Sequence, residues 1–457
     1  MKICFWRFRV VDTNFSSPSV QGRAVRAPSS PPGMSRDDYD DVQFTTLVRE
    51  EEVSSSGMPS TIEPEDTHNI AYWSCFILGG GLLFPWNAYI SAVDYFGELY
   101  PDEHVDRAFG VLYFLPNLAA LCGVLRWGNT VEARHRIRFG YLAFLFCLVV
   151  PAASTSLIAT YVAVALTGVA DAICQGSLFG TIAPMPEKFT QALMGGTSFS
   201  GLVVSALRLI TKGIFSQTKE GKRRGAVAYF MVSAAWVSIC LVLFTRLEKT
   251  PVYVYHHRNE VYSNTENDDE YEADQAPVRS SENHSHNKIL DKRKFTSIVR
   301  SIWPHVCTVF SVYAVTLSIF PGVLAEDVRN ESLGDWYPVL LITCFNAFDV
   351  LGKMLPRWWV WGSSILGEKP KTLAVASVLR VLFVPAFLFV SKENAPLACT
   401  VLVASLGLTN GWYSSVGMMT APKTFVENGD QEICGTVMVF FLLGGLATGA
   451  ACGWLWV

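Results

Sequence analysis

A short polar cluster interrupts an apolar stretch of the chain between Phe345 and Lys353. Asn346, Asp349 and Lys353 bring an amide, a carboxylate and an ammonium group to positions i, i+3 and i+7. On an α-helix this spacing puts all three on one face. If the helix lies in lipid, the face must look onto other helices or a watery cavity, because charge at membrane depth is costly and usually functional. The cluster is therefore a candidate for ligand contact or for internal charge pairing.

A second candidate follows three glycines and a proline in the first apolar stretch. Pro85 frees a backbone carbonyl of its helix and kinks it. Trp86 and Asn87 come directly after the kink. They would aim an aromatic ring and an amide at a central cavity, or Trp86 would serve as an anchor at the membrane interface.

Two further stretches carry buried charge. Asp171 and Gln175 are one helical turn apart and share a face. Asp171 could carry a coupling proton or pair with a buried cation. Arg380 lies near the middle of another apolar stretch, too deep to reach water easily, and should need a carboxylate. Asp349 and Asp171 are the partners at comparable depth, and direct contact with a ligand is the alternative.

The elements that position these residues are long apolar runs. The chain has 457 residues, of which 50% are hydrophobic and 17% charged. A membrane-spanning helix needs about 20 mostly apolar residues. Eleven such runs centre on 70–92, 107–127, 138–158, 160–184, 191–212, 226–245, 302–322, 337–357, 372–391, 396–418 and 433–457. The sequence predicts an all-α polytopic membrane protein that spans the lipid bilayer eleven times.

Polar segments divide this chain into four regions. Residues 1–69 are rich in Ser, Pro and acidic residues and are expected to form a disordered cytosolic tail. Residues 246–298 have the composition of a cytosolic linker loop. The linker separates a six-helix bundle, 70–245, from a five-helix bundle, 299–457. Transporters built from two related bundles have this layout.

The distribution of Lys and Arg predicts the orientation. The loops expected in the cytosol carry Arg126, Arg134, Arg136 and Arg138 after the second run, and Lys353, Arg357, Lys369 and Lys371 after the eighth. This places the N-terminus in the cytosol and the C-terminus outside the cell. Asn330 begins a glycosylation sequon in a loop expected outside. One loop disobeys the rule, because Lys212, Lys219, Lys222, Arg223 and Arg224 also fall outside.

Composition argues against several other classes of protein. The net charge of −4 offers no basic surface for nucleic acid. The eleven cysteines lack CxxC spacing, and no cofactor or metal site is indicated. A membrane-embedded enzyme is a distant alternative, because His305 alone among the histidines enters a run and no catalytic constellation accompanies it. A receptor is equally distant, since no feature supports it.

Taken together, the motifs resemble the equilibrative nucleoside transporter family from about residue 70 to the end. They are Pro85-Trp86-Asn87, Gln175 to Gly180, Phe320-Pro321, Phe345-Asn346 with Phe348-Asp349 and Leu351-Gly352, Arg380 with Phe383-Val384-Pro385, Asn410-Gly411 and Pro422-Lys423. The resemblance implies a fold akin to the major facilitator superfamily, with bundles of six and five helices. It also implies transport of nucleosides, and in some members nucleobases, either down their gradient or with protons.

The resemblance also assigns roles to single residues. Leu83, Trp86, Gln175, Asp349 and Leu446 stand at the family's central ligand-binding positions. Trp86 would flank the base, Gln175 would bond base edges and Asp349 would accept from ribose hydroxyls. The remaining substrate-binding candidates are Asn346, Lys353 and Arg380. Lys353 stands where animal facilitators have arginine, which keeps the charge but loses the two-pronged geometry.

Two positions bear on the substrate and on coupling. Asp171 replaces a glycine of the animal facilitators, as in plant-like members, and this favours a proton as co-substrate. Thr197 stands where the monoamine-carrying branch has an acidic residue, which argues against an organic cation as substrate. Asp171 and Asp349 keep an organic cation open as the alternative substrate. The expected protein is a monomer in the plasma membrane.

Overall fold

The computed structural model describes residues 64–101, 105–153, 156–215, 218–257, 292–319, 336–358, 369–392 and 395–453, and every regular element among them is a helix. Most of the predicted tail and linker, as well as Asn330, lies outside these residues. All of the described residues belong to one compact unit, Pro64–Val457.

The predicted apolar runs all coincide with helices. The first six correspond to α2 (Ile70–Ser91), α4 (Val105–Trp127), α5 (Ala133–Ala153), α6 (Leu157–Ile182), α7 (Glu187–Ile214) and α8 (Lys219–Leu247). The others correspond to α12 (Trp303–Ile319), α14 (Trp336–Trp358), the broken helix α16 (Pro370–Leu379), η3 (Arg380–Leu382) and α17 (Phe383–Lys392), then α18 (Pro396–Thr420) and α19 (Asn428–Gly453). Short helices are α3 (Val93–Leu99), α9 (Pro251–His256) and α11 (Lys292–Ser301).

Length and hydropathy qualify many of these helices to cross a membrane. Among the described residues, seven helices are long and apolar enough, or eight if the bent pair Arg293–Ser301 and Trp303–Ile319 is one span. Large apolar side chains also face outward, and Ile158 and Leu397 are 75% and 79% exposed. Such faces fit lipid. The all-helical membrane fold is confirmed, whereas eleven crossings stay a prediction.

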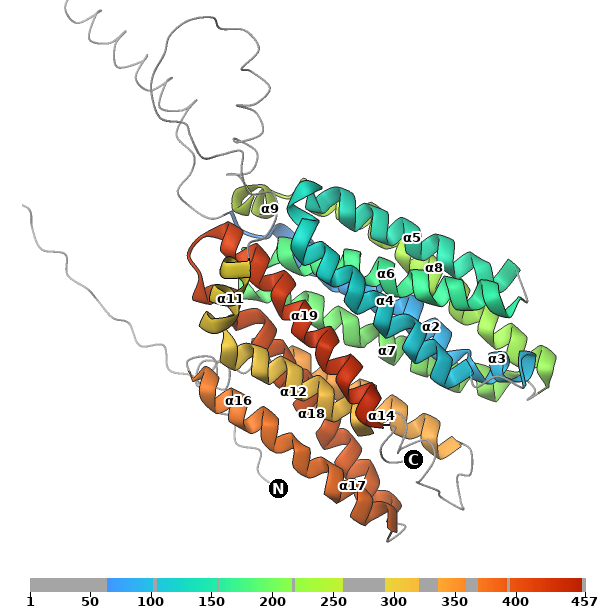
Figure 1. Ribbon diagram of the computed structural model, residues 1–457. Helices are drawn as coiled ribbons and strands as arrows, with labels where there is room; N and C mark the ends of the chain where they lie inside the picture. Colours follow the sequence, from blue (N-terminus) through green and yellow to red (C-terminus); the bar gives the residue numbers. More distant parts are fainter. Residues whose placement is uncertain are drawn as a thin grey trace, which may run out of the picture. The chain divides into compact units, whose positions relative to one another are not determined.

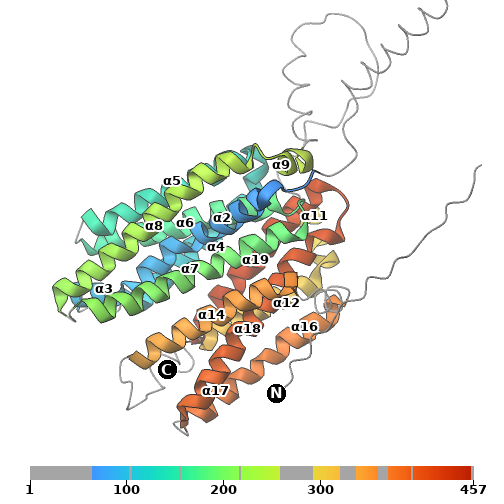
Figure 2. The same ribbon diagram turned by 180° about the vertical axis from the view of Figure 1, so that it is seen from behind.

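The helices pack in two groups that touch along two seams. Figure 1 shows α2 to α8 side by side, and α12 to α19 side by side, and Figure 2 shows the same grouping from behind. Within the first group α2 packs on α7, and α4 and α5 pack on α6. Within the second, α14 packs on α18 and α12 packs on α19. The contacts of α7 with α14 and of α6 with α19 join the groups.

Sequence features explain how α2 begins and why it can lie close to α7. The carboxylate of Asp66 accepts hydrogen bonds from the backbone N–H groups of Ala71 and Tyr72, both at 2.9 Å, which satisfies donors that a helix start leaves unpaired. A Cβ atom added to Gly196 of α7 would lie only 1.8 Å from the carbonyl oxygen of Phe76. Only glycine therefore permits this approach of α2 and α7.

Candidate functional site

Asp349 lies at the centre of a polar cluster between α7, α14 and α18. Its side chain is buried, and Oδ2 accepts a hydrogen bond from the hydroxyl of Ser198 on α7. Oδ1 accepts from Nδ2 of Asn410 on α18 at 2.7 Å. Lys353, one turn further along α14, places Nζ 3.4 Å from Oδ2 and also donates to Ser198 and, at 3.3 Å, to Thr197. The carboxylate, the ammonium group and the serine therefore link the two groups of helices near mid-helix.

Asn346 extends the contact between α14 and α7 toward the C-terminal end of α7. Its Nδ2 donates to the hydroxyl of Ser205 at 2.7 Å and to the carbonyl oxygen of Gly201 at 3.3 Å. The predicted common face of Asn346, Asp349 and Lys353 is confirmed, and it faces α7.

Arg380 forms no direct ion pair with Asp349 or Asp171, so the predicted carboxylate partner is wrong. The guanidinium is buried and donates to Thr409 Oγ1 of α18 at 3.1 Å. Its other acceptors lie on α12 and α18. They are the carbonyl oxygens of Val312 at 2.8 Å and Leu406 at 3.1 Å and the hydroxyl of Thr316 at 2.9 Å. Carbonyl and hydroxyl oxygens can accept the hydrogen bonds that the guanidinium N–H groups donate.

Two side chains connect Arg380 to Asp349 indirectly. Arg380 donates to Thr316, and the hydroxyl of Thr316 donates to Oδ1 of Asn410 at 2.8 Å. The amide of Asn410 in turn donates to Asp349. Chains of hydrogen bonds of this kind polarise one another in a low dielectric. The arginine therefore acts on the carboxylate through Thr316 and Asn410.

The second polar group surrounds Asp171, between α4 and α6. Its Oδ2 accepts from the Tyr113 hydroxyl at 2.9 Å and from Nδ2 of Asn117 at 2.8 Å. These partners are neutral and no cation pairs with Asp171 among the residues that the structure describes, so the predicted buried cation is wrong for this part of the chain. Trp86 of α2 stacks on Tyr113, with ring centroids 4.1 Å apart and planes inclined by 23°. The indole thus covers the tyrosine that bonds the carboxylate.

Three buried acceptor atoms at this site have no hydrogen-bond donor among the described residues. They are Oδ1 of Asp171, Oδ1 of Asn117 and Oε1 of Gln175. A buried acceptor without a donor costs free energy of desolvation. A proton on Asp171 Oδ1 would provide a donor for Asn117 Oδ1 or Gln175 Oε1. A donor group of a ligand could do the same.

The two predicted leucines, Leu83 and Leu446, lie on α2 and α19. Leu83 on α2 and Leu446 on α19 are both half-buried, and Leu446 packs against the same large hydrophobic core as Trp86. Next to Trp86, Asn87 donates to the hydroxyl of Ser200 on α7 at 2.9 Å. This bond ties the Trp86 region to the helix that carries Ser198.

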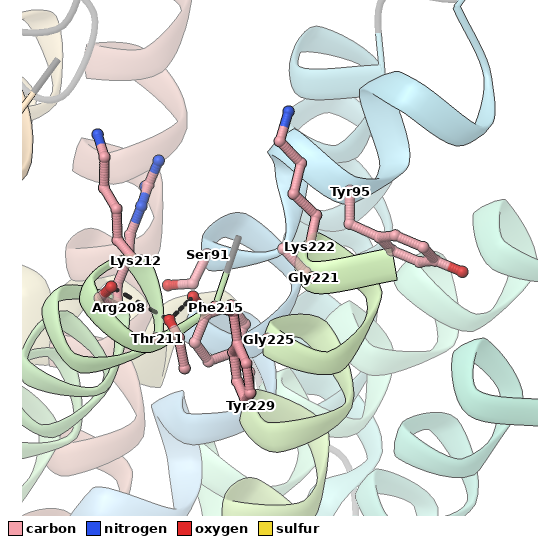
Figure 3. Close-up of a pocket in the computed structure, with 11 residues that line it drawn as sticks. Ser91, Tyr95, Arg208, Thr211, Lys212, Phe215, Gly221, Lys222, Gly225 and Tyr229 are labelled. Atoms are coloured by element: carbon pink, nitrogen blue, oxygen red, sulfur yellow. Dashed lines mark hydrogen bonds between the residues drawn. The ribbon is translucent and has the colours of Figure 1, made fainter. Parts of the chain in front are cut away.

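The loop that disobeys the charge rule contributes to a pocket between α2, α3, α7 and α8. Figure 3 shows Arg208 and Lys212 on one side of it and Lys222 on the other. Lys222 forms an ion pair with Glu98, and the ammonium of Lys212 lies 5.2 Å from the ring centroid of Trp336. Local partners therefore compensate part of the positive charge that the predicted orientation leaves outside.

Comparison with known proteins decides the family. A family model described as "Nucleoside transporter" matches residues 161–457. The protein named "Equilibrative nucleotide transporter 1" of Arabidopsis thaliana is 38% identical, and the match covers 86% of this chain and 87% of that protein. The chain belongs to the equilibrative nucleoside transporter family.

Other matches agree with this assignment. "Equilibrative nucleotide transporter 8" of Arabidopsis thaliana is 34% identical over 87% of this chain and 97% of its own length, which places the chain near plant members of the family. The solved structure of the E. coli fucose:proton symporter superposes with a TM-score of 0.51 at 13% identity, covering 84% of this chain and 94% of the other. That likeness shows a major-facilitator-type fold. Members of the family named here are transporters, and the chain is not an enzyme.

Sequence reasoning missed several residues that this nucleoside transporter places at the two polar groups. Tyr113 and Asn117 bond Asp171, and Ser198 and Thr316 bond the Asp349 network. Tyr113 and Asn117 are four residues apart, the same spacing as Asp171 and Gln175, so a shared helical face could have revealed them. Ser198 was hidden in a run of small residues that is typical of helix packing.

The geometry around Arg380 predicts the effect of a conservative change. We expect Arg380→Lys to lower the thermal stability of the purified protein, because an ammonium group cannot span acceptors on both α12 and α18. Each lost bond to a charged group costs about 1.5–3 kcal/mol. Arg300→Lys on α11 is the matched control, because that side chain is exposed. Equal melting temperatures for the two variants would contradict the inferred role of Arg380.

Proposed function

We propose that this protein carries nucleosides across the membrane by alternating access, holding the solute between its two helix bundles. The observation that carries the proposal is the buried contact of Asp349 and Lys353 on α14 with Ser198 on α7. It joins the bundles at mid-helix, where transporters of this architecture bind their solutes. Movement of one bundle against the other must rearrange these bonds.

The chemistry of the surrounding residues suits a nucleoside. Trp86 and Tyr113 supply stacked aromatic rings that could flank a flat base. A ribose hydroxyl could replace the Ser198 hydroxyl as donor to Asp349. Lys353 is already bonded to Ser198 and Thr197, so its ammonium group needs no phosphate of a ligand as partner. This favours a neutral nucleoside as the solute over the nucleotide that the names of the Arabidopsis relatives mention. An organic cation finds less support, because Asp349 is already paired with Lys353.

Uptake of radiolabelled adenosine or uridine into cells that lack their own carriers tests this function. We expect uptake above control cells and competition by other nucleosides. A panel of nucleosides and nucleobases, applied at two external pH values, would define the substrate range. Surface expression without uptake of any nucleoside or nucleobase would overturn the proposal.

A proton as co-substrate is favoured by the three acceptors without donors beside Asp171. Protonation of Asp171 would supply the missing donor to one of its neighbours, and loss of the proton would withdraw it. Trp86 stacks on Tyr113, and Tyr113 donates to Asp171. Movement of these two rings could couple the protonation of Asp171 to movement of the solute.

Replacement of Asp171 by asparagine tests the coupling. An amide cannot exchange a proton in this pH range, so we expect Asp171→Asn to transport with little dependence on external pH. The wild type should transport several-fold faster at pH 5.5 than at pH 7.5, because the proton gradient then drives uptake. Glu220→Gln is the matched control, because that carboxylate is 74% exposed at the start of α8, and it should keep the wild-type profile. Identical pH profiles for Asp171→Asn and the wild type would contradict proton coupling through Asp171.

We also propose that the protein acts as a monomer in the plasma membrane with its N-terminus in the cytosol. The ion pair of Arg138 with Glu248 supports part of this orientation, because it joins the start of α5 to the end of α8. The ion pair of Lys294 with Asp430, at 2.8 Å, likewise joins the start of α11 to the start of α19. These four helix ends are all predicted to face the cytosol.

A further inference from the structure

His257 follows the short helix α9 and is buried between two backbone acceptors. Its Nδ1 lies 2.9 Å from the carbonyl oxygen of Tyr253, and its Nε2 lies 3.0 Å from the carbonyl oxygen of Thr181. Neutral imidazole carries hydrogen on one nitrogen only, so it can satisfy one of these acceptors. Only the doubly protonated ring donates to both, and the Tyr253 carbonyl also accepts from the backbone N–H of His257 at 3.1 Å. The side chain is only 7% exposed, so water cannot readily substitute.

The segment around His257 touches both helix bundles. Thr181 belongs to α6 of the first bundle. Glu432 belongs to α19 of the second, and its Oε1 lies 3.9 Å from Nε2 of His257. Asn428 at the start of α19 also donates to the carbonyl oxygen of His256 at 2.8 Å. The chain just after α8 therefore bridges the two bundles at the end predicted to face the cytosol.

The same end holds direct contacts between α6 and α19. The hydroxyl of Thr436 donates to the carbonyl oxygen of Gly176 at 3.0 Å. A Cβ atom added to Gly435 would lie 2.6 Å from the carbonyl oxygen of Phe179, so the backbones are in close contact. In alternating access this end must separate to release solute. The segment around His257 must then lose its contact with Thr181 of α6 or its contacts with Glu432 and Asn428 of α19.

Glu432 of α19 is the charged group in contact with His257. Other charged groups of the neighbouring elements interact with one another: Arg136 of α5 with Glu432, Arg134 of α5 with Glu248 after α8, and Lys294 of α11 with Asp430 of α19. Burial lowers the pKa of the Arg136 guanidinium, and the nearby Glu432 carboxylate opposes that effect. Glu432 Oε1 lies 3.9 Å from the imidazole, so this contact joins the segment to α19.

We infer that His257 is a proton-dependent latch on the cytosolic end of the transport pathway, closing α6 onto α19 when the ring is doubly protonated. At acidic cytosolic pH the imidazolium donates to Tyr253 and Thr181 and attracts Glu432. At alkaline pH one ring nitrogen turns its lone pair to a carbonyl oxygen, and the closed end is weakened. The inference rests on the alternating-access function proposed above and adds a site that regulates it from the cytosol.

Hydrogen exchange on the purified full-length protein tests the latch without any solute, so its outcome is independent of whether nucleosides are carried. The segments 176–183 and 428–436 would be followed at pH 6 and pH 8, with correction for the intrinsic pH dependence of exchange. We expect the wild type to open about tenfold less often at pH 6. His257→Gln keeps one donor but cannot titrate, and its corrected exchange should differ less than twofold between the two pH values.

Two further variants make the result specific. His256→Gln changes the neighbouring histidine, whose part in the bridge is its backbone carbonyl, and should keep the tenfold difference. Glu432→Gln keeps the imidazole but removes the nearest negative charge, and should reduce the difference even if His257→Gln does not fold. A wild type without pH-dependent opening, or a Glu432→Gln or folded His257→Gln protein with the full difference, would overturn the latch.

Discussion

Removal of the Asp349 carboxylate should abolish transport and most of the folded protein. In Asp349→Ala the ammonium of Lys353 stays buried without its counter-charge, and Asn410 loses its acceptor. Breaking one side of a buried ion pair typically costs about 3–5 kcal/mol. This cost is a large fraction of the free energy of unfolding of an ordinary domain, which is about 5–15 kcal/mol. The yield of monodisperse protein after size-exclusion chromatography, together with uptake, measures both effects.

A double variant separates folding from solute binding. Lys353→Met alone should also destabilise the protein, because it leaves Asp349 with a buried negative charge. Asp349→Ala with Lys353→Met removes both charges, and we expect it to recover much of the folded yield. It should still fail to transport, because the acceptor for ribose is gone. Uptake by the double variant near the wild-type rate would show that Asp349 serves folding only.

The milder change Asp349→Asn distinguishes the same two roles by kinetics. An amide keeps the shape of the carboxylate and one oxygen acceptor, so the hydrogen bonds with Ser198 and Asn410 can partly re-form. If Asp349 contacts the solute, folded protein persists and the apparent KM rises about tenfold or more, as expected when a charged hydrogen bond is lost. Loss of folded protein with this variant would instead assign Asp349 to folding.

The sequence was sufficient for the helices because each run must match the thickness of a bilayer. All eleven predicted runs coincide with helices, and charge-poor stretches of about 20 residues can form little else in lipid. The break at Arg380–Leu382 was not predicted, although Pro385 lies nearby. A proline shows that a helix can bend but not where its hydrogen bonding changes.

The site was predicted in part, and the errors have a common cause. Helical spacing correctly grouped Asn346, Asp349 and Lys353, because residues on one helix have fixed relative positions. The partners of Arg380 and Asp171 lie on other helices, and their choice depends on how those helices pack. Sequence reasoning paired charge with charge. The protein instead uses backbone carbonyls, hydroxyls and amides, which every helix offers and no motif marks.

Gly411 controls how closely α18 approaches the helix that bears Asp349, and a single methyl group there should disable the protein. A Cβ atom at this position would lie 2.2 Å from the carbonyl oxygen of Asp349 and 2.8 Å from the backbone nitrogen of Lys353. Both are main-chain atoms, so neither can swing aside and α14 must move. Overpacking of this kind costs about 1–3 kcal/mol or more.

The displacement caused by Gly411→Ala should affect transport beyond its effect on stability. Moving α14 away from α18 lengthens the bond from Asn410 to Asp349 and shifts Lys353 relative to Ser198. We expect a lower melting temperature and at least a tenfold loss of uptake per folded molecule. Gly110→Ala on α4 is the matched control, because its Cβ would meet no atom within 4 Å and alanine favours the helix by about 1 kcal/mol. If Gly411→Ala melted and transported like Gly110→Ala, the close contact of α14 with α18 could not be what positions Asp349.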